Sequence, residues 1–223
     1  MTLQPSLFKE LVSDDRQMLV EHLLKWPPEV SEQGFCNLII WRHYCQTRWC
    51  GYGEHLLFVE QRPDGSHYLL PPLGPGITPD LICHLLTWLE KQYPGQQAAI
   101  ERAGRRLVEQ LDQRCSIEPE PDHADYLYQR SELAELKGKR LQYKRSLVRR
   151  LQKQHVVQSV PLATTHLDDC RRVYRLWQES KAGQVDRDEA CAVNECLELF
   201  DELPLSGIAI MIDGRIEGFS ISE

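Results

Sequence analysis

The order in which strand-like and helix-like segments follow one another constrains this chain more than any other feature of its sequence. A short apolar run, 56–59, lies within the segment 55–61, and apolar residues recur at helical spacing over 81–89. Segments rich in proline, glycine or aspartate separate such stretches. From residue 7 to residue 128 the segments read β-α-α-β-β-β-α-β-α-β-β. This order predicts an α/β protein of the α+β type, with mixed, mostly antiparallel sheets.

The first series has clear start and stop signals. A helix opens at 13–15, where a capping serine precedes two acids, and Trp26-Pro27-Pro28 stops it. Another helix opens with Thr78-Pro79-Asp80, because threonine caps and proline suits the first helical position. We also expect a helix from about residue 31, a short helix at 104–112, and strands at 7–11, 47–51, 55–61, 67–70, 97–102, 116–118 and 125–128.

The order begins again after residue 155. We expect a strand at 156–161, a helix at 166–180 with Cys170, Val173, Tyr174 and Trp177 inward, and an acidic helix at 186–202. Strands at 205–212 and 215–222 follow, joined by an Asp213-Gly214 turn. This β-α-α-β-β order is the first half of the earlier series.

The predicted domains are therefore 1–130, a basic connecting helix at 131–155, and 156–223 as the first half of a second domain. We expect the second domain to be incomplete, because it stops where the first series continues. A full second domain would require a chain of roughly 280 residues.

Composition excludes several classes of protein. No run approaches the ~18 apolar residues of a membrane span. The N-terminus lacks the basic and apolar regions of a secretion signal, so we expect a cytoplasmic protein with free thiols at its eight cysteines. The net charge of −7 argues against a general nucleic-acid binder.

The segment 136–153 is the strongest functional signal, because it holds eight basic residues and no acid. Leu141, Leu147, Val148 and Leu151 form an apolar stripe at helical spacing, which leaves the other faces basic. We predict that five residues hold phosphates of tRNA, coenzyme A or a lipid head group: Lys137, Lys139, Arg140, Lys144 and Arg145. The alternative is a solvated connecting helix whose charges pair with the acidic helix.

A candidate pocket consists of Glu29, Ser31, Asn37, Gly74 and Gly76. The Gly74-Pro75-Gly76 loop precedes a capped helix, where backbone N–H groups can hold a pyrophosphate. Pro75 removes one donor, and Pro71 stands where this kind of loop usually has glutamine or arginine. A rigid loop leading into a helix, and a capping role for Ser31, are the alternatives.

A metal site is not predicted. His43, Cys45, Cys50 and His55 follow the pattern H-x-C-x4-C-x4-H, but no C-x-x-C fixes the geometry and strand residues alternate between faces. The Cys191-x4-Cys196 pair is predicted to be helix packing.

Several motifs are spread over nearly the whole chain. They lie at 26–32 (WPPEVSE), 35–41 (FCNLIIW), 70–74 (LPPLG), 125–128 (DYLY), 136–139 (LKGK) with 143–145 (YKR), and 213–220 (DGRIEGFS). Together they resemble the motifs of a bacterial family, the C-terminal domain of phosphatidylglycerol lysyltransferase. The resemblance implies two tandem acetyltransferase-like domains, the second truncated here. It also implies transfer of an aminoacyl group from aminoacyl-tRNA to a lipid or a peptide amine. Ser146 departs from the family motif, which usually has asparagine there.

Residues and resemblance together favour an acyl- or aminoacyltransferase with aminoacyl-tRNA or acyl-CoA as donor and an amine or hydroxyl as acceptor. No further cofactor is assigned, and Glu223 is the one candidate for a general base. The alternative is a non-catalytic module of the same fold that binds a nucleotide, tRNA or a protein partner. The prolines of the 71–76 loop favour that alternative for the first domain.

Overall fold

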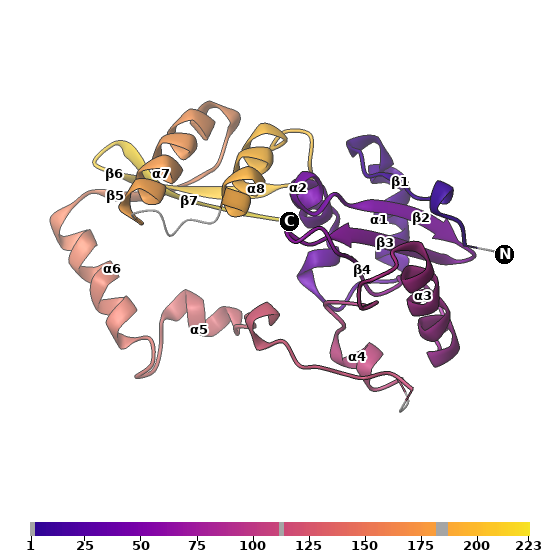
Figure 1. Ribbon diagram of the computed structural model, residues 1–223. Helices are drawn as coiled ribbons and strands as arrows, with labels where there is room; N and C mark the ends of the chain where they lie inside the picture. The colour runs from indigo at the N-terminus through magenta and orange to yellow at the C-terminus, as the bar shows by residue number, and fades with distance from the viewer. Residues whose placement is uncertain (1–2, 112–113, 182–186) are drawn as a thin grey trace. The chain divides into compact units, whose positions relative to one another are not determined.

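The computed structural model describes residues 3–111, 114–181 and 187–223. The chain divides into two compact units, Met1–Asp125 (unit 1) and Tyr126–Glu223 (unit 2). Each unit combines helices with an antiparallel sheet, which confirms the predicted α+β class (Figure 1). The predicted domain limits at residues 130 and 155 stay a prediction.

Unit 1 contains a four-stranded antiparallel sheet in the order β1-β2-β3-β4. The strands are β1 (Lys9–Glu10), β2 (Arg48–Tyr52), β3 (His55–Gln61) and β4 (His67–Leu69). Two isolated bridges extend this sheet: Leu56 pairs antiparallel with Leu73, and Leu69 pairs parallel with Ile100. The bridges attach two later segments of the chain to β3 and β4.

The helices of unit 1 are α1 (Arg16–Lys25), α2 (Phe35–Cys45), α3 (Pro79–Gln92) and the short α4 (Arg105–Val108). Helix α3 begins as its sequence predicts, because the Thr78 side chain accepts the backbone N–H of Leu81 and Pro79 occupies the first position. Helix α2 ends at Gln46, which adopts a left-handed conformation with φ of 47°. Single 3₁₀ turns at Pro5–Leu7, Ser13–Asp15, Ser31–Gln33 and Pro121–His123 connect the elements.

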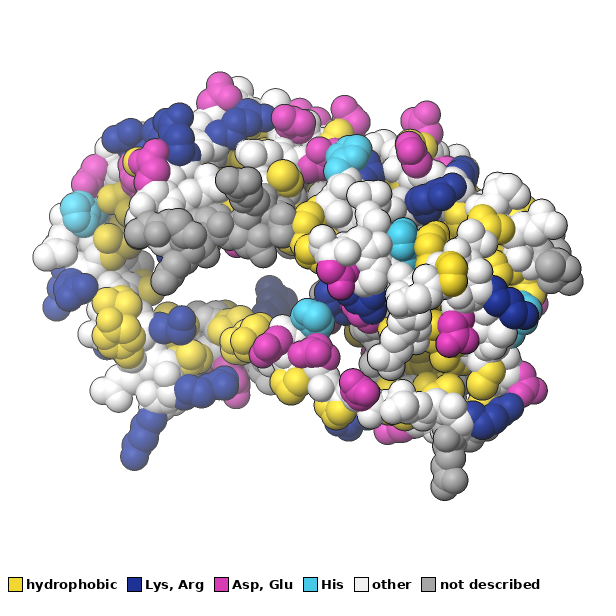
Figure 2. All heavy atoms as spheres, viewed as in Figure 1, with side chains coloured by type: hydrophobic (Ala, Val, Ile, Leu, Met, Phe, Trp, Pro, Cys, Tyr) yellow, Lys and Arg dark blue, Asp and Glu magenta, His cyan; other side chains and the backbone are white. Residues whose placement is uncertain are grey.

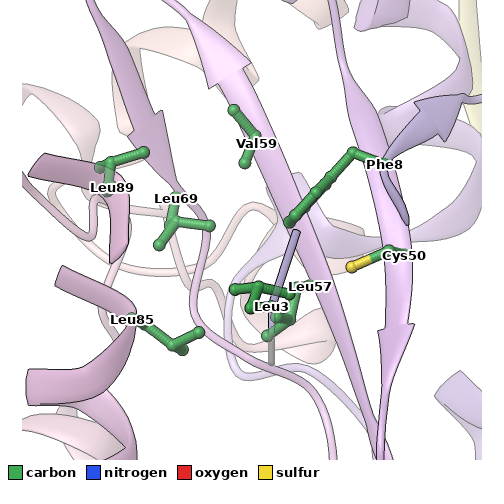
Figure 3. Packing of buried hydrophobic residues seen from close by; sticks show 8 residues of the cluster. All are labelled: Leu3, Phe8, Cys50, Leu57, Val59, Leu69, Leu85 and Leu89. Carbon is green, nitrogen blue, oxygen red and sulfur yellow. The ribbon is translucent and has the colours of Figure 1, made fainter. Parts of the chain in front are cut away.

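Strand β3 is buried on both faces. Leu57 and Val59 pack against Leu85 and Leu89 of α3 (Figure 3). Leu56 and Phe58 point to the opposite face because side chains alternate along a strand, and both are also buried. Its central residues 56–59 form a continuous apolar run, as expected for a strand covered on both sides.

Two buried carboxyl groups lie among the elements of this sheet. Burial raises the pKa of Glu60, although Tyr68 and Thr47 donate hydrogen bonds to its two oxygens at 2.7 and 2.8 Å. Burial would also raise the pKa of Asp15, but hydrogen bonds from Lys9, Trp49 and the Val12 backbone lower it below its usual value.

Unit 2 contains the three-stranded antiparallel sheet β5-β6-β7, formed by Val157–Pro161, Ser206–Ile212 and Arg215–Ser222. Helices α7 (Leu167–Ser180) and α8 (Arg187–Glu198) contribute Cys170 and Leu197 to one core with Ala209 and Ile216 of the sheet. Ile208 on the other side of β6 is 50% exposed, so this sheet is less covered than that of unit 1. Asp213 and Gly214 both have positive φ, as a two-residue hairpin turn requires.

The prediction of one continuous basic helix is wrong. The segment forms α5 (Arg130–Glu135) and α6 (Gln142–Gln154), separated by a turn in which Leu136 and Gly138 have φ of 47° and 83°. Gly138 lies in the left-handed region that glycine adopts without steric cost, and this interrupts the helix that the basic composition suggested.

Other sequence predictions also need correction. Residues 116–118 and 125–128 form no strand, because no ladder partner lies beside them in the described structure. The segment 97–102 contributes only the single bridge at Ile100, and 7–11 shortens to β1. Trp177 was expected inward but is 40% exposed, whereas Cys170 and Tyr174 are buried.

The buried carboxyl of Glu60 makes a testable prediction about pH. A carboxyl whose pKa is raised by folding holds its proton more tightly in the folded state, so stability falls as pH rises above the ordinary value of 4.5. Glu60→Gln removes this ionisation while keeping hydrogen-bonding capacity. Relative to the unsubstituted chain, the variant should therefore gain stability as pH rises from about 4 to 8.

Denaturant titrations at several pH values measure the difference in free energy of unfolding. Glu90→Gln, at an exposed position of α3, is the matched control and should show no such trend. A Glu60→Gln difference that is independent of pH would contradict the assignment.

Candidate functional site

A pocket of about 220 Å³ lies in unit 1, lined by residues from 26–33, 71–77 and 102–110. The first two segments contain the WPPEV and PPLG motifs singled out in the sequence. Trp26, Pro28, Pro72 and Leu107 give it apolar walls. The charged lining residues are Glu29, Arg102 and Arg106.

Hydrogen bonds to backbone carbonyls hold the 71–74 segment in place. The buried Gln33 side chain donates to the Pro71 carbonyl at 2.7 Å, and His22 Nε2 lies 2.8 Å from the Leu73 oxygen. Leu73 also exchanges two backbone hydrogen bonds with Leu56 of β3. This wall is therefore fixed both to the sheet and to residues of the α1–α2 region.

Glu29 connects two walls of the pocket. Its Oε2 accepts the backbone N–H of Arg106 at 2.8 Å and lies 3.9 Å from Nε of the same residue. A Cβ atom on Gly104 would lie 2.4 Å from that oxygen, so a larger residue there would displace the carboxylate from its present position. The backbone of 104–106 is thus shaped around Glu29.

Arg102 lines the pocket from an unusual backbone conformation. It has φ of 60°, which non-glycine residues rarely adopt. Its side chain is 20% exposed, and Nη1 lies 3.8 Å from Oε1 of Glu32. The surrounding structure must hold this strained conformation in place.

The structure brings together only part of the predicted pocket. Glu29 and Gly74 line it, whereas Ser31, Asn37 and Gly76 are not among its lining residues. Ser31 instead donates its backbone N–H and its hydroxyl to Asp125, at 3.0 and 2.6 Å, and its carbonyl accepts from Asn37. These three residues fix the end of unit 1 onto the turn before α2.

The predicted phosphate loop has little room at its first glycine. A Cβ on Gly74 would lie 2.7 Å from the Glu54 carbonyl oxygen, and the Pro75 carbonyl accepts from His55 at 2.7 Å. Pro71, Pro72 and Pro75 have no N–H, and the Leu73 N–H is bonded to Leu56. The loop therefore has few backbone N–H groups left for a phosphate, and phosphate binding by it stays a prediction.

Sequence reasoning missed the third wall, formed by Arg102, Gly104 and Arg106. The available signal was a glycine flanked by arginines directly after a predicted strand. Nothing in the sequence alone pairs Gly104 with Glu29.

The basic residues of unit 2 lie on an exposed segment. Lys137 forms an ion pair with Glu135, Arg140 lies 3.4 Å from Glu132, and Arg145 donates to the Leu136 carbonyl. In this segment, five exposed cations make no ion pair or hydrogen bond with the described residues: Lys139, Lys144, Arg149, Arg150 and Lys153. Figure 2 shows basic and apolar side chains side by side along the α5–α6 segment.

Helical spacing places Arg145, Arg149 and Lys153 on one face of α6, and Leu147 and Leu151 on the other. Within the described part of the chain, the ion pairs of this segment are made with Glu135 and Glu132 of α5. The geometry offers anionic partners a row of exposed cations.

The remaining candidates lie apart from the pocket lining. Glu223 is exposed and follows β7, and its role as a base stays a prediction. Among the described residues no group of three potential metal ligands is found, and none of the eight cysteines forms a disulfide. Two residues of the H-x-C-x4-C-x4-H pattern have other surroundings. Cys50 is buried, which raises the pKa of its thiol to about 12. His55 Nε2 contacts the Pro75 carbonyl.

Comparison with known proteins identifies the class of protein. A crystal structure of a conserved protein of unknown function from Bacteroides thetaiotaomicron matches with a TM-score of 0.82 and 22% sequence identity, covering 98% of this chain and 75% of that one. This likeness establishes the fold.

The family model for phosphatidylglycerol lysyltransferase, C-terminal, matches residues 26–223. The chain therefore belongs to this family, as its motifs predicted. Comparison with curated proteins found no match. Within the described part of the chain, none of the helices has the length and apolar character needed to cross a membrane.

The close approach of Gly104 to Glu29 makes a prediction about this site. Gly104→Ala would place a methyl group 2.4 Å from Oε2, so Glu29 must move and lose its hydrogen bond to the Arg106 backbone. We expect a loss of about 0.5–1.5 kcal/mol in free energy of unfolding, the usual contribution of one hydrogen bond.

Thermal or denaturant unfolding of the variant measures this loss. Gly51→Ala is the control, because a Cβ there meets no atom within 4 Å. Equal stability of the two variants would show that the 104–106 backbone is not shaped by Glu29.

Proposed function

We propose that this chain is an aminoacyltransferase that acts in the cytoplasm and takes its aminoacyl group from a charged tRNA held by the basic residues of α6. Its two units would be tandem acetyltransferase-like domains. Membership of the phosphatidylglycerol lysyltransferase C-terminal family supports aminoacyl transfer in general. The observation that supports tRNA as the donor is the row of exposed, unpaired cations on α6.

The chemistry requires little covalent participation by the protein. An acceptor amine or hydroxyl attacks the ester carbonyl of the donor, a tetrahedral oxyanion forms, and its collapse releases the 3′-hydroxyl of the tRNA. The protein's contribution is to hold the donor phosphates, orient the ester and stabilise the oxyanion. The proposed phosphate-holding residues are Lys137, Lys139, Arg140, Lys144 and Arg145, and the structure suggests Arg149, Arg150 and Lys153 as additions on the same segment.

Acyl-CoA is the second candidate donor, and a non-catalytic binding module is the second candidate function. The prolines of the 71–76 loop favour the module for unit 1, because they remove donors that a pyrophosphate would need. Titration with labelled acetyl-CoA and with charged tRNA separates these options. Binding of neither at micromolar concentration would contradict the transferase proposal.

The tRNA proposal makes a prediction about salt. Each phosphate contact contributes about 0.7–0.9 to the steepness of log K against log salt, so Arg149→Gln with Lys153→Gln should lower that steepness by about 1.4–1.8 and weaken binding. The residues lie four apart on one exposed face of α6. Filter binding or fluorescence anisotropy between about 50 and 200 mM salt measures the slope.

A matched control is Arg171→Gln with Arg175→Gln on α7. This pair has the same spacing, is exposed and removes the same charge from unit 2. If both double variants lower the slope equally, binding depends on net charge rather than on α6. Salt-insensitive binding by the unsubstituted chain would remove the tRNA role.

A further inference from the structure

The pocket of unit 1 contains a guanidinium group that the structure does not explain. The Arg102 side chain is 20% exposed, and its nearest acid, Glu32, lies 3.8 Å away, beyond hydrogen-bond distance. Among the described residues no acceptor hydrogen-bonds to this guanidinium, which carries five N–H donors in a fixed plane. A largely covered guanidinium whose single ion pair is too long for a hydrogen bond is stabilised further when an anion reaches its remaining donors.

Arg106 places a second cation at the same pocket. Its backbone N–H already satisfies Glu29 Oε2 at 2.8 Å, and its Nε lies 3.9 Å from that oxygen. The guanidinium therefore keeps its own donors for another acceptor. Each arginine therefore has one carboxylate nearby, Glu32 beside Arg102 and Glu29 beside Arg106, and both guanidinium groups keep donors that these long ion pairs do not use.

Arg102 lines the pocket from an energetically unfavourable backbone conformation. A φ of 60° is disfavoured for arginine, and such strain persists only where surrounding contacts determine it. Ile100, two residues earlier, is fixed by its bridge to Leu69 of β4, and Gly104, two residues later, is fixed against Glu29. The strained residue is thus held between two anchored positions.

The rest of the pocket limits the size and polarity of the ligand. Its volume of about 220 Å³ lies below the ~300–1,000 Å³ of sites that hold drug-sized molecules. Trp26, Pro28 and Leu107 present apolar surface beside the arginines. An inorganic ion alone would leave these walls without a partner.

We infer that this pocket binds a small organic anion, a carboxylate or phosphate monoester with a compact apolar body, whose charged group lies between Arg102 and Arg106. The inference concerns unit 1 and involves no residue of α6. It therefore stands or falls separately from the tRNA proposal.

Calorimetric titration of the full chain with benzoate, phenyl phosphate and benzamide tests this inference. Benzamide has the shape of benzoate without its charge, so the anions should bind at least about tenfold more tightly than benzamide. The stronger of the two anions identifies the carboxylate or the phosphate class. Equal binding of benzoate, phenyl phosphate and benzamide, or no binding of either anion up to millimolar concentration, would overturn the inference.

Arg102→Asn is the decisive variant, because asparagine tolerates the left-handed backbone and removes only the guanidinium. It should weaken anion binding about tenfold or more while its melting temperature stays close to that of the unsubstituted chain. Arg106→Gln should weaken binding to a smaller degree, since its side chain is 69% exposed. An unchanged affinity in Arg102→Asn would overturn the assignment.

Arg105→Gln is the matched control, since Arg105 is the exposed neighbour that does not line the pocket. It should leave anion affinity unchanged. If it weakens binding as much as Arg102→Asn, the anions respond to surface charge and the pocket is not their site.

Discussion

The burial of β3 on both faces is the constraint on which the structure of unit 1 depends. Five consecutive residues of this strand are buried, so neither face can be left to solvent. Helix α3 covers the face of Leu57 and Val59, and the opposite face carries Phe58 and the buried carboxyl of Glu60. A carboxyl in such a place requires donors, and Thr47 and Tyr68 supply them. The burial of β3 therefore requires apolar side chains on one face and hydrogen-bond donors for Glu60 on the other.

The pocket follows from the same strand. Leu56 at its start pairs with Leu73 and so fixes the proline-rich wall, while β4, its neighbour, pairs through Leu69 with Ile100 and so directs the chain toward Arg102. Each bridge is a pair of backbone hydrogen bonds between segments far apart in sequence. The contact between Glu29 and Gly104 then closes the pocket between segments that the sheet has already placed.

Local signals explain which parts of the fold the sequence predicts. The apolar run of β3, the threonine and proline before α3 and the Asp213-Gly214 turn act within a few residues, and each element forms where expected. Residues 116–118 and 125–128 have strand-like composition, but a strand needs a ladder partner that composition cannot specify. The turn at Gly138 likewise divides a segment whose charge pattern alone suggests one helix. Arg102 was missed because its importance comes from contacts made across the fold.

The two groups of basic residues differ in physical character, and this separates their roles. The cations of α6 are exposed, so water solvates them at little cost and salt screens their attraction for a distant anion. Such a surface suits a polyanion that makes many weak contacts. Arg102 is mostly covered and held by a strained backbone, so its partner must be small enough to enter and close enough to escape screening. The two proposed sites therefore differ in kind: the site on α6 would be diffuse and salt-dependent, the site at Arg102 would be more confined, and their ligands should belong to different classes.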